Sequence, residues 1–266
     1  MTLRVCLAGA TGWAGAALAR AIVQTDDLEL VAGVSRRQAG RDLGEVLGIP
    51  HLNIVLSASA AEALTTACDV FVEYTQPEVA KANVITAMRR GAHVVIGTSG
   101  LSDQDLEALD ALARQHHTGV LAVGNFSLAN VLLQKCAELA AKYLAQWEII
   151  DYADAGKIDA PSGTTRELAY RLSKIRPPQL QVPLDQIQGP PESRGATLNG
   201  MQVHSIRLPG YVISAEVIFG VLDQKLTIRY DAGNSPEPYV EGALLAIRRV
   251  GTFVGLKRGL DSVMDF

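Results

Sequence analysis

Three glycines at regular spacing constrain the fold of this chain more than any other feature. An apolar run at residues 3–8 is followed by Gly9, Gly12 and Gly15, and then by a helical stretch at residues 16–24. In a βαβ unit, such glycines form the tight turn after the strand, let the backbone approach a pyrophosphate, and pack the helix against the strand. We therefore expect a dinucleotide-binding turn; the alternative is a βα turn that binds nothing. The turn residues expected to contact the cofactor are Gly9, Thr11, Gly12 and Trp13.

The segments after the glycine turn alternate between strands and helices. The β-branched or apolar runs that predict strands are residues 28–34, 70–74, 93–96 and 119–123. The predicted helices are residues 78–90, residues 103–116 with Ser102 as the N-cap, and residues 128–144. This alternation predicts a parallel sheet covered by helices, and hence a Rossmann-like α/β domain.

Small and polar residues directly follow two of these strands. Thr75 follows one strand, and Gly97, Thr98 and Ser99 follow the next. Ligands of open α/β sheets lie outside the carboxyl ends of the strands, so we expect these loops to line the nicotinamide half of the site. Glu73 precedes the first loop, and the sequence leaves open whether it faces the cofactor or is a strand residue with satisfied hydrogen bonds.

A basic loop follows the second predicted strand. Ser35, Arg36 and Arg37 lie about 20 residues beyond the glycines, where an NAD site usually carries Asp or Glu for the ribose hydroxyls. A carboxylate would repel a 2′-phosphate, whereas a hydroxyl and two guanidinium groups bind it through charge-assisted hydrogen bonds. We therefore predict NADPH as the cofactor, with NADH possible. The alternative is that both arginines lie on a solvated loop.

The composition argues against several other classes of protein. With 24 Lys and Arg against 28 Asp and Glu, the 266-residue chain has a net charge of −4 and no basic cluster, so nucleic acid is not an expected partner. No apolar segment is long enough to predict a membrane span. The three cysteines lie far apart in apolar runs, which is typical of reduced thiols in a cytoplasmic protein. The adjacent His116 and His117 would point about 100° apart on a helix, and we predict no metal site.

The second half of the chain has a different pattern. Strands predicted at residues 201–208, 215–219 and 225–230 follow one another without intervening helices. This order favours a mixed or antiparallel sheet, which suits a substrate-binding and oligomerisation domain at residues 126–235. The dinucleotide-binding domain would comprise residues 1–125 and 236–266, because we expect the closing helix at residues 241–252 to return to it.

A polar loop forms the candidate anion site of the second domain. A predicted strand at residues 148–152 and a predicted helix from about residue 165 to residue 174 flank it. Free N–H groups and the positive end of the helix dipole attract an anion to a helix N-terminus. Ser162, Gly163 and Thr164 are therefore candidate substrate-binding residues, with Lys157 beside the ligand. The alternative is an ordinary turn and N-cap with a solvated lysine.

The segment Lys157-Ile-Asp-Ala-Pro-Ser-Gly-Thr164 resembles the signature of the dihydrodipicolinate reductase family, the nicotinamide-dependent enzymes of bacterial lysine synthesis. The resemblance covers nearly the whole chain in the family's order. Its further segments are the three glycines, Tyr74-Thr-Gln-Pro-Glu78, Gly97-Thr-Ser-Gly100 and Asn125-Phe-Ser127.

This resemblance implies a Rossmann-like domain, a mixed α/β domain that holds the substrate, and a homotetramer. It implies that Gly97, Thr98 and Asn125 contact the nicotinamide half, and it adds Tyr74 and Phe126 to the cofactor site. It also implies that Lys157, Ser162, Gly163 and Thr164 hold a small carboxylated substrate and assist its protonation.

Three departures from the family pattern concern the same pocket. The family carries two adjacent histidines ahead of the lysine, one of them usually assigned as proton donor or substrate ligand, whereas this chain has Ala153 and Asp154. Tyr230 stands where the family usually has a histidine, and residues 232–238 lack an expected arginine. Because Lys157 is retained, we interpret the chain as a reductase with retained chemistry and an altered substrate.

The expected reaction is hydride transfer from the nicotinamide to an electron-poor C=N or conjugated C=C carbon of a carboxylated substrate. Lys157 would stabilise the resulting electron density and donate a proton. Because lysine is a weak acid at neutral pH, we expect burial or a neighbouring cation to lower its pKa. Asp154 or Tyr152 would take part in proton transfer in place of the missing imidazoles. Their side chains share one face of the strand only if the strand continues through residue 154. The Asp154 carboxylate would disfavour a second substrate carboxylate, which favours a monoanionic or amine-bearing substrate.

Three classes of function remain open from the sequence. The first is a lysine-pathway reductase that tolerates the lost histidines. The second is a paralogue that acts as an imine reductase, an ene reductase or an amine dehydrogenase. The third is a non-catalytic cofactor-binding assembly protein. The intact Lys157 and the intact glycine turn favour the two enzyme classes, although a fold alone does not fix a function.

Overall fold

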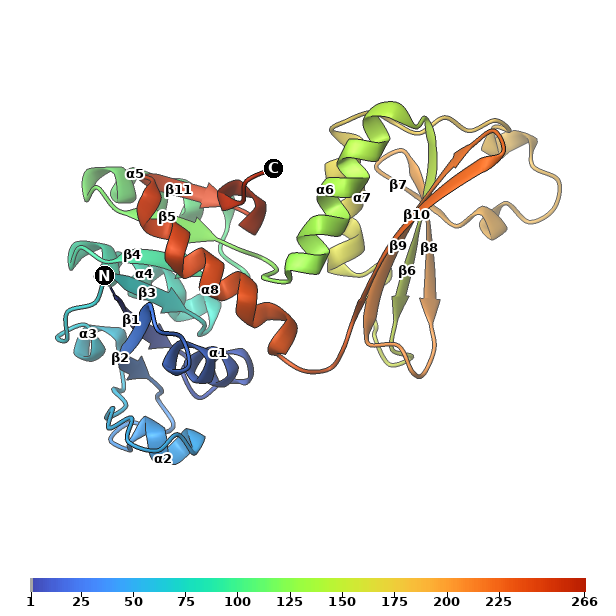
Figure 1. Cartoon of the computed structure of the whole chain (residues 1–266). Helices are drawn as coiled ribbons and strands as arrows, with labels where there is room; N and C mark the ends of the chain where they lie inside the picture. Colours follow the sequence, from blue (N-terminus) through green and yellow to red (C-terminus); the bar gives the residue numbers. More distant parts are fainter. Residues whose placement is uncertain (1) are drawn as a thin grey trace. The chain divides into compact units, whose positions relative to one another are not determined.

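The computed structural model describes residues 2–266 and contains two compact units. The first unit comprises the chain up to Leu128 together with Pro236–Phe266, and the second comprises Ala129–Ser235. Each unit has its own sheet and its own hydrophobic core (Figure 1).

The first unit contains a six-stranded sheet in the order β11-β5-β4-β3-β1-β2, and all of its paired strands are parallel. The strands are β1 (Leu3–Ala8), β2 (Leu28–Val34), β3 (Val70–Glu73), β4 (His93–Ile96), β5 (Gly119–Ala122) and β11 (Gly255–Arg258). The chain passes from β1 to β2 on one side and then to β3 on the other. The strand order therefore reverses at β1 and β3, and this switch point is where open α/β sheets bind ligands.

Helices cover both faces of this sheet. The helices of the first unit are α1 (Trp13–Val23), α2 (Leu43–Leu47), α3 (Ala60–Ala63), α4 (Pro77–Arg89), α5 (Asp103–Gln115) and α8 (Val240–Arg249). Apolar residues of α3, α4 and α5 share a buried cluster with Cys6, Phe71 and Val94 of the sheet. Helix α8 packs against α1 on the other face (Figure 1). Strands buried on both faces are mostly apolar, which is why β3 and β4 were recognisable in the sequence.

The second unit contains a five-stranded mixed sheet in the order β10-β9-β6-β8-β7. Its elements are α6 (Leu128–Tyr143), β6 (Gln146–Ala153), α7 (Gly163–Ser173), β7 (Ala196–Leu198), β8 (Met201–Arg207), β9 (Ile213–Val221) and β10 (Gln224–Ala232). Strands β6 and β8 are parallel, whereas β6 with β9 and β9 with β10 are antiparallel. Helices α6 and α7 lie on one side of this sheet, and their apolar residues pack against Trp147, Ile149 and Phe219.

The predicted fold class, a Rossmann-like parallel-sheet domain plus a mixed-sheet α/β domain, is confirmed. Two helices begin two or more residues earlier than predicted. Helix α1 begins at Trp13 rather than at residue 16, because Gly12 is the N-cap. Gly15 therefore lies inside the helix, where a Cβ would be 2.9 Å from the Gly9 carbonyl carbon. Helix α7 begins at Gly163 rather than near Thr165, because Ser162 is the N-cap.

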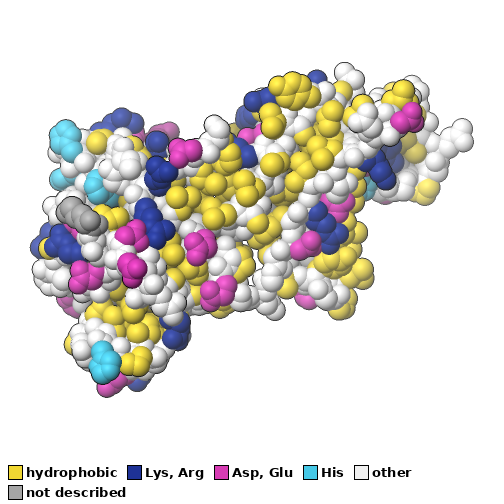
Figure 2. Space-filling view, in the orientation of Figure 1, with side chains coloured by type: hydrophobic (Ala, Val, Ile, Leu, Met, Phe, Trp, Pro, Cys, Tyr) yellow, Lys and Arg dark blue, Asp and Glu magenta, His cyan; other side chains and the backbone are white. Residues whose placement is uncertain are grey.

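The elements that the sequence did not predict are short, with three to five residues each, so they carry no full helical or strand period. They are α2, α3, β7, β11 and the 3₁₀ turns Leu184–Gln186, Pro191–Arg194, Glu237–Tyr239 and Leu260–Val263. The predicted closing helix at residues 241–252 ends as the 3₁₀ turn Val250–Thr252. None of the helices in residues 2–266 has the length and apolar character that a membrane span requires. On the face shown in Figure 2, Lys and Arg side chains are dispersed among Asp and Glu instead of forming one patch.

Candidate functional site

The glycine turn between β1 and α1 has the geometry of an anion site. Gly9 adopts a φ of +81°, a conformation that L side chains rarely adopt, and its N–H donates to the Val34 carbonyl at 3.0 Å. Gly12 is the N-cap of α1 and has no side chain to bond the first N–H groups of the helix. Those N–H groups and the helix dipole favour a phosphate at this point, so the residues present fit a dinucleotide.

A cavity of about 450 Å³, which we call the Arg36 cavity, lies outside the carboxyl ends of β1, β2 and β3. Its lining includes Gly9, Thr11, Gly12, Ser35, Arg36, Arg37, Ser59, Tyr74, Thr75, Val79 and Asn83. No Asp or Glu of the described chain lines it. The cavity therefore suits a negatively charged ligand.

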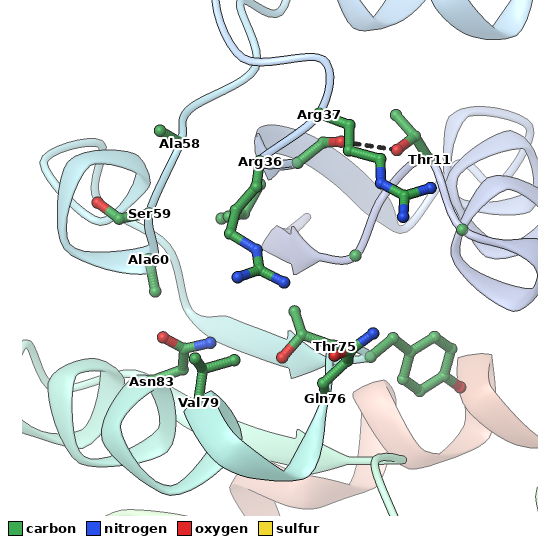
Figure 3. Close-up of a pocket in the computed structure, with 15 residues that line it drawn as sticks. Thr11, Arg36, Arg37, Ala58, Ser59, Ala60, Thr75, Gln76, Val79 and Asn83 are labelled. Carbon is green, nitrogen blue, oxygen red and sulfur yellow. Dashed lines mark hydrogen bonds between the residues drawn. The ribbon is translucent and has the colours of Figure 1, made fainter.

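The basic loop after β2 forms one wall of this cavity. The Arg36 guanidinium points into it, whereas Arg37 lies on the side of Thr11 (Figure 3). The hydroxyls of Thr11 and Ser35 are 2.7 Å apart, which connects the basic loop to the glycine turn. Within residues 2–266, neither arginine is recorded in an ion pair, so both charges are available to a ligand.

A second cavity of about 290 Å³, which we call the Gly97 cavity, shares Tyr74 and Thr75 with the first. Its lining includes Trp13, Tyr74, Thr75, Gly97, Thr98, Ser99, Asn125, Phe126 and Tyr239. The rings of Tyr74 and Phe126 lie 5.5 Å apart. A Cβ at Gly97 would be 2.8 Å from the Phe126 ring, so only glycine leaves these rings undisturbed. All the cofactor residues predicted from the sequence line one of these two adjoining cavities.

Glu73, whose orientation the sequence left open, is fully buried at the carboxyl end of β3. Its carboxylate accepts hydrogen bonds from the Thr75 N–H at 2.8 Å, the Thr75 hydroxyl, and the Asn83 amide at 2.9 Å. Burial raises the pKa of Glu73, and the hydrogen bonds from Thr75 and Asn83 only partly oppose this shift. Glu73 is therefore a strand residue with satisfied hydrogen bonds that lies beneath both cavities.

Several lining residues were not predicted. Ser59 and Glu62 match the S-x-x-E pattern of a capping box, and Ser59 does cap α3, so its position at a helix N-terminus was recognisable. Val79, Asn83 and Tyr239 carry no comparable local signal. Val79 and Asn83 reach the Arg36 cavity because α4 packs beside β3, and Tyr239 reaches the Gly97 cavity beside the Trp13 ring, 5.8 Å away.

In the second unit, the loop between β6 and α7 carries Lys157. The Lys157 ammonium forms an ion pair with Asp159 at 2.6 Å, and this contact lowers the pKa of the Asp159 carboxyl. The Arg166 guanidinium lies 3.8 Å from the same carboxylate, so Lys157 and Arg166 share Asp159 as their partner. Strand β6 ends at Ala153, so Asp154 lies in the loop, exposed, and accepts from the Gly156 N–H at 2.8 Å. The condition for Asp154 and Tyr152 to share a strand face is therefore not met.

The N-terminus of α7 presents backbone donors beside this loop. Ser162 is fully buried: its N–H donates to Asp151 at 2.9 Å, and its hydroxyl accepts from the Thr165 N–H at 3.3 Å. Ser162 thus shapes the turn with both of its polar groups. No described residue accepts a hydrogen bond from the N–H groups of Gly163 and Thr164, and these remain for a ligand.

A buried carboxylate that sequence reasoning missed holds this turn in place. Asp151 accepts from Ser162, from the Thr165 hydroxyl at 2.9 Å, and from the Arg207 guanidinium at 2.7 Å. Arg207 also donates to the Asp159 carbonyl at 2.6 Å. Burial alone would raise the pKa of Asp151, but hydrogen bonds from Ser162, Arg207 and Thr165 outweigh it and keep the pKa below its ordinary value. Asp151 and Arg207 together fix the loop that contains Lys157.

Tyr152, the other predicted proton-transfer residue, belongs to a separate network. Its hydroxyl donates to Glu216 at 3.0 Å, and the Arg229 guanidinium lies 4.6 Å from the ring centroid. Burial and the hydrogen bond to Glu216 raise the pKa of Tyr152. The hydroxyl proton is therefore already engaged within the sheet. Tyr230 is also buried, and its hydroxyl has no partner among the described residues.

Comparison with known proteins decides the family. Residues 3–126 match the family model described as dihydrodipicolinate reductase, N-terminus, and residues 129–264 match the corresponding C-terminus model. The chain belongs to the dihydrodipicolinate reductase family. The 4-hydroxy-tetrahydrodipicolinate reductase of Moorella thermoacetica is 38% identical over 100% of this chain and 99% of its own length. The enzyme of the same name from Geobacillus kaustophilus is 35% identical, with 100% of both chains covered.

A solved structure of the dihydrodipicolinate reductase family has the same fold as this chain. Dihydrodipicolinate reductase from Paenisporosarcina sp. TG-14, with dipicolinate bound, gives a TM-score of 0.89 at 28% identity and covers 99% of this chain and 100% of its own. An amine dehydrogenase from Mycobacterium smegmatis has a TM-score of 0.68 at 15% identity, with 100% of this chain and 97% of its own covered, and is similar in fold alone.

The predicted enzyme class, an NAD(P)H-dependent oxidoreductase of the dihydrodipicolinate reductase family, is thereby confirmed. The glycine turn and the two cavities fit a nicotinamide dinucleotide, as argued above from Gly9, Gly12 and Arg36.

Proposed function

We propose that this chain uses NADPH to reduce a C=N or conjugated C=C bond of a small carboxylated substrate, and that 4-hydroxy-tetrahydrodipicolinate is the first substrate to test. The observation that carries this proposal is the pair of N–H groups of Gly163 and Thr164, which have no described partner at the N-terminus of α7 in the unit that holds Lys157. A substrate carboxylate at this helix end is stabilised by the N–H groups and the helix dipole.

The first unit would hold the cofactor and the second unit would hold the substrate. The nicotinamide, when bound, supplies the hydride. Lys157, as an ammonium held by Asp159, stabilises the electron density that the reduced bond gains and donates a proton to it. Asp151 and Arg207 support this role by fixing the loop between β6 and α7. Ser162 contributes by capping α7 and not through a free hydroxyl.

The proposal of NADPH over NADH rests on the Arg36 cavity. Arg36 points into it, Ser35 and Arg37 line it, and no carboxylate of the described chain does. A 2′-phosphate would accept charge-assisted hydrogen bonds from these groups, whereas NADH has only an uncharged hydroxyl at this position.

A second candidate function has one observation in its favour. Asp154 stands where the family carries a histidine, and its carboxylate is exposed in the same loop as Lys157. A negative charge there disfavours a dicarboxylate and favours a monocarboxylic imine or an amine-bearing substrate. We expect Asp154→His to shift the preference toward dicarboxylates. Equal preference in the wild type and the variant would contradict this charge argument.

The proposed function is tested by following NADPH oxidation with freshly generated 4-hydroxy-tetrahydrodipicolinate. We expect turnover by the wild type and a loss of kcat/KM of about a hundredfold or more in Lys157→Ala, which is the range for removal of a proton donor. Lys174→Ala is the matched control, because Lys174 lies at the C-cap of α7 and contacts only the Tyr170 ring among the contacts recorded for it. Full activity in Lys157→Ala would contradict the proposed role of this lysine.

We also propose the homotetramer that the family resemblance implies. Helices α6 and α7 cover one side of the five-stranded sheet, and strand alternation places Tyr152, Glu216 and Arg229 on the other. A tetramer through this surface would cover Thr227 and Arg229 of β10, which are exposed on this side. Light scattering at several protein concentrations tests it, and a monomer at every concentration would contradict it.

A cytoplasmic location is a further proposal. The three cysteines are all free, and Cys6 is fully buried in the first unit, which suits a reducing compartment.

A further inference from the structure

Glu73 combines two properties that the proposed reaction does not use. Its carboxylate is completely buried, and no Lys or Arg of residues 2–266 is recorded in an ion pair with it. Burying a carboxylate without a cation is unfavourable unless hydrogen bonds compensate for the lost water. Here the compensating donors belong to residues that line the two cavities.

The donors to Glu73 come from three different segments. Thr75, in the loop after β3, donates both its N–H and its hydroxyl. Asn83, on α4, donates its amide to the other carboxylate oxygen at 2.9 Å. The Thr98 hydroxyl, in the loop after β4, lies 3.2 Å from the Glu73 carbonyl and 3.4 Å from its carboxylate, and it donates to one of the two. One residue therefore connects the loops after β3 and β4 to helix α4.

This arrangement determines what the threonine hydroxyls offer to a ligand. A threonine hydroxyl has one hydrogen and two lone pairs. Because Thr75 and Thr98 give their hydrogens to Glu73, their oxygens can only accept hydrogen bonds from a ligand. Thr75 and Thr98 both line the Gly97 cavity, which shares Thr75 with the Arg36 cavity. The Gly97 cavity thus presents hydroxyl acceptors that match an amide N–H₂ group.

We propose that Glu73 is a positioning residue that orients Thr75 and Thr98 as hydrogen-bond acceptors for the carboxamide N–H₂ of the nicotinamide. This inference rests on the proposed use of a nicotinamide cofactor. Glu73 would thereby make the site selective for the carboxamide group, while the glycine turn and the Arg36 loop bind the adenosine half of the cofactor.

The test compares three ligands that differ only in what reaches the Gly97 cavity. These are NADP⁺, its 3-acetylpyridine analogue, in which a methyl group replaces the amide N–H₂, and 2′,5′-ADP, which lacks the nicotinamide half. Their dissociation constants are measured by calorimetry for the wild type, Glu73→Gln and Glu78→Gln. Glu78 is the matched control, because it is exposed in the first turn of α4 and lines neither cavity.

We expect Glu73→Gln to weaken NADP⁺ binding about tenfold, the factor that corresponds to one misdirected hydrogen bond. The glutamine amide N–H₂ would itself donate to the threonine oxygens and so compete with the nicotinamide carboxamide for them. The preference for NADP⁺ over the acetylpyridine analogue should therefore fall by a similar factor. Binding of 2′,5′-ADP should stay within about twofold, and Glu78→Gln should match the wild type.

Several outcomes would overturn the inference. Equal weakening of all three ligands would mean that Glu73 only supports the fold, and an unchanged preference would mean that it does not orient the threonines. If Glu73→Gln does not fold, as judged by circular dichroism, the double variant Thr75→Val, Thr98→Val carries the test, and a retained preference for the amide would refute the inference.

The design separates this inference from the proposed function. A wild type that binds neither NADP⁺ nor NAD⁺ would contradict the proposed function and the inference with it. A wild type that binds only the form without the 2′-phosphate would be tested in the same way with NAD⁺, its acetylpyridine analogue and 5′-AMP. Binding by the wild type with an unchanged preference in Glu73→Gln would overturn the inference alone.

Discussion

Replacement of Arg36 by alanine is the prediction that tests cofactor choice most sharply. The Arg36 guanidinium points into the cavity beside the glycine turn, and no carboxylate of the described residues pairs with it (Figure 3). A 2′-phosphate at this point would accept hydrogen bonds from Arg36, whereas NADH has only a hydroxyl there. The substitution should therefore weaken NADPH and leave NADH nearly unaffected.

The size of the effect follows from the exposure of the side chain. Hydrogen bonds to charged groups contribute about 1.5–3 kcal/mol. Because Arg36 is exposed to solvent, we take the lower value, about 1.5 kcal/mol, which corresponds to a roughly tenfold weaker dissociation constant for NADPH. Arg37 lies on the Thr11 side of the same loop, so the double variant should lose more than either single one.

The assay is titration of nicotinamide fluorescence with NADPH and with NADH for each variant. Arg41→Ala is the matched control, because Arg41 follows on the same loop, bonds to Gln38 at 2.8 Å, and lies outside both cavities. A loss of affinity that is equal for NADPH and NADH, or no loss for either, would refute the assignment of Arg36 to the 2′-phosphate.

Two further predictions concern the residues that hold the site together. Asp151→Asn leaves Arg207 without its buried carboxylate partner and should lower the free energy of unfolding by roughly 3 kcal/mol at neutral pH in urea titrations; an unchanged unfolding midpoint would contradict it. Because the pKa of Asp151 is lower in the folded state than in the unfolded state, its stabilisation is fully present above the ordinary pKa of an aspartate, about 3.9. It is lost as the pH falls through the lower folded-state value, so the two unfolding curves should converge in acid. Gly97→Ala places a methyl group against the Tyr74 and Phe126 rings, and we expect at least a roughly tenfold loss of NADPH affinity with unchanged far-ultraviolet circular dichroism; affinity equal to the wild type would show that the rings yield freely.

The cofactor half of the molecule could be predicted well because its signals are local. Strands β1 and β4 have the predicted bounds, since buried parallel strands are mostly apolar. Gly9 and Gly97 mark positions where a Cβ does not fit, and such positions are visible in a sequence as glycines after strands.

The substrate half was less predictable because its contacts join distant residues. Asp151 and Arg207 are 56 positions apart, and Tyr152 and Glu216 are 64 positions apart. No periodicity indicates that Asp151 is buried within β6, since an acidic residue in a strand usually faces solvent. The role of Ser162 likewise depends on Asp151. We predicted that Ser162 binds the substrate, but its N–H donates to Asp151.

Glu73 combines a feature that could be predicted from the sequence with one that could not. The sequence placed it beside the cofactor loops, but its orientation depends on Asn83, ten positions away on α4, and on Thr98, 25 positions away after β4. Those two contacts exist only once the parallel sheet has formed.

Isotope transfer tests the central claim most directly. The protein is incubated with 4-hydroxy-tetrahydrodipicolinate and NADPH that carries deuterium at one face of the nicotinamide C4. The product should be one mass unit heavier with one of the two labelled cofactors. NADPH labelled at the opposite face should give an unlabelled product. Lys157→Ala should form little of either. If the wild type forms a product without deuterium from both cofactors, or no reduced product, hydride transfer to this carboxylated substrate is contradicted.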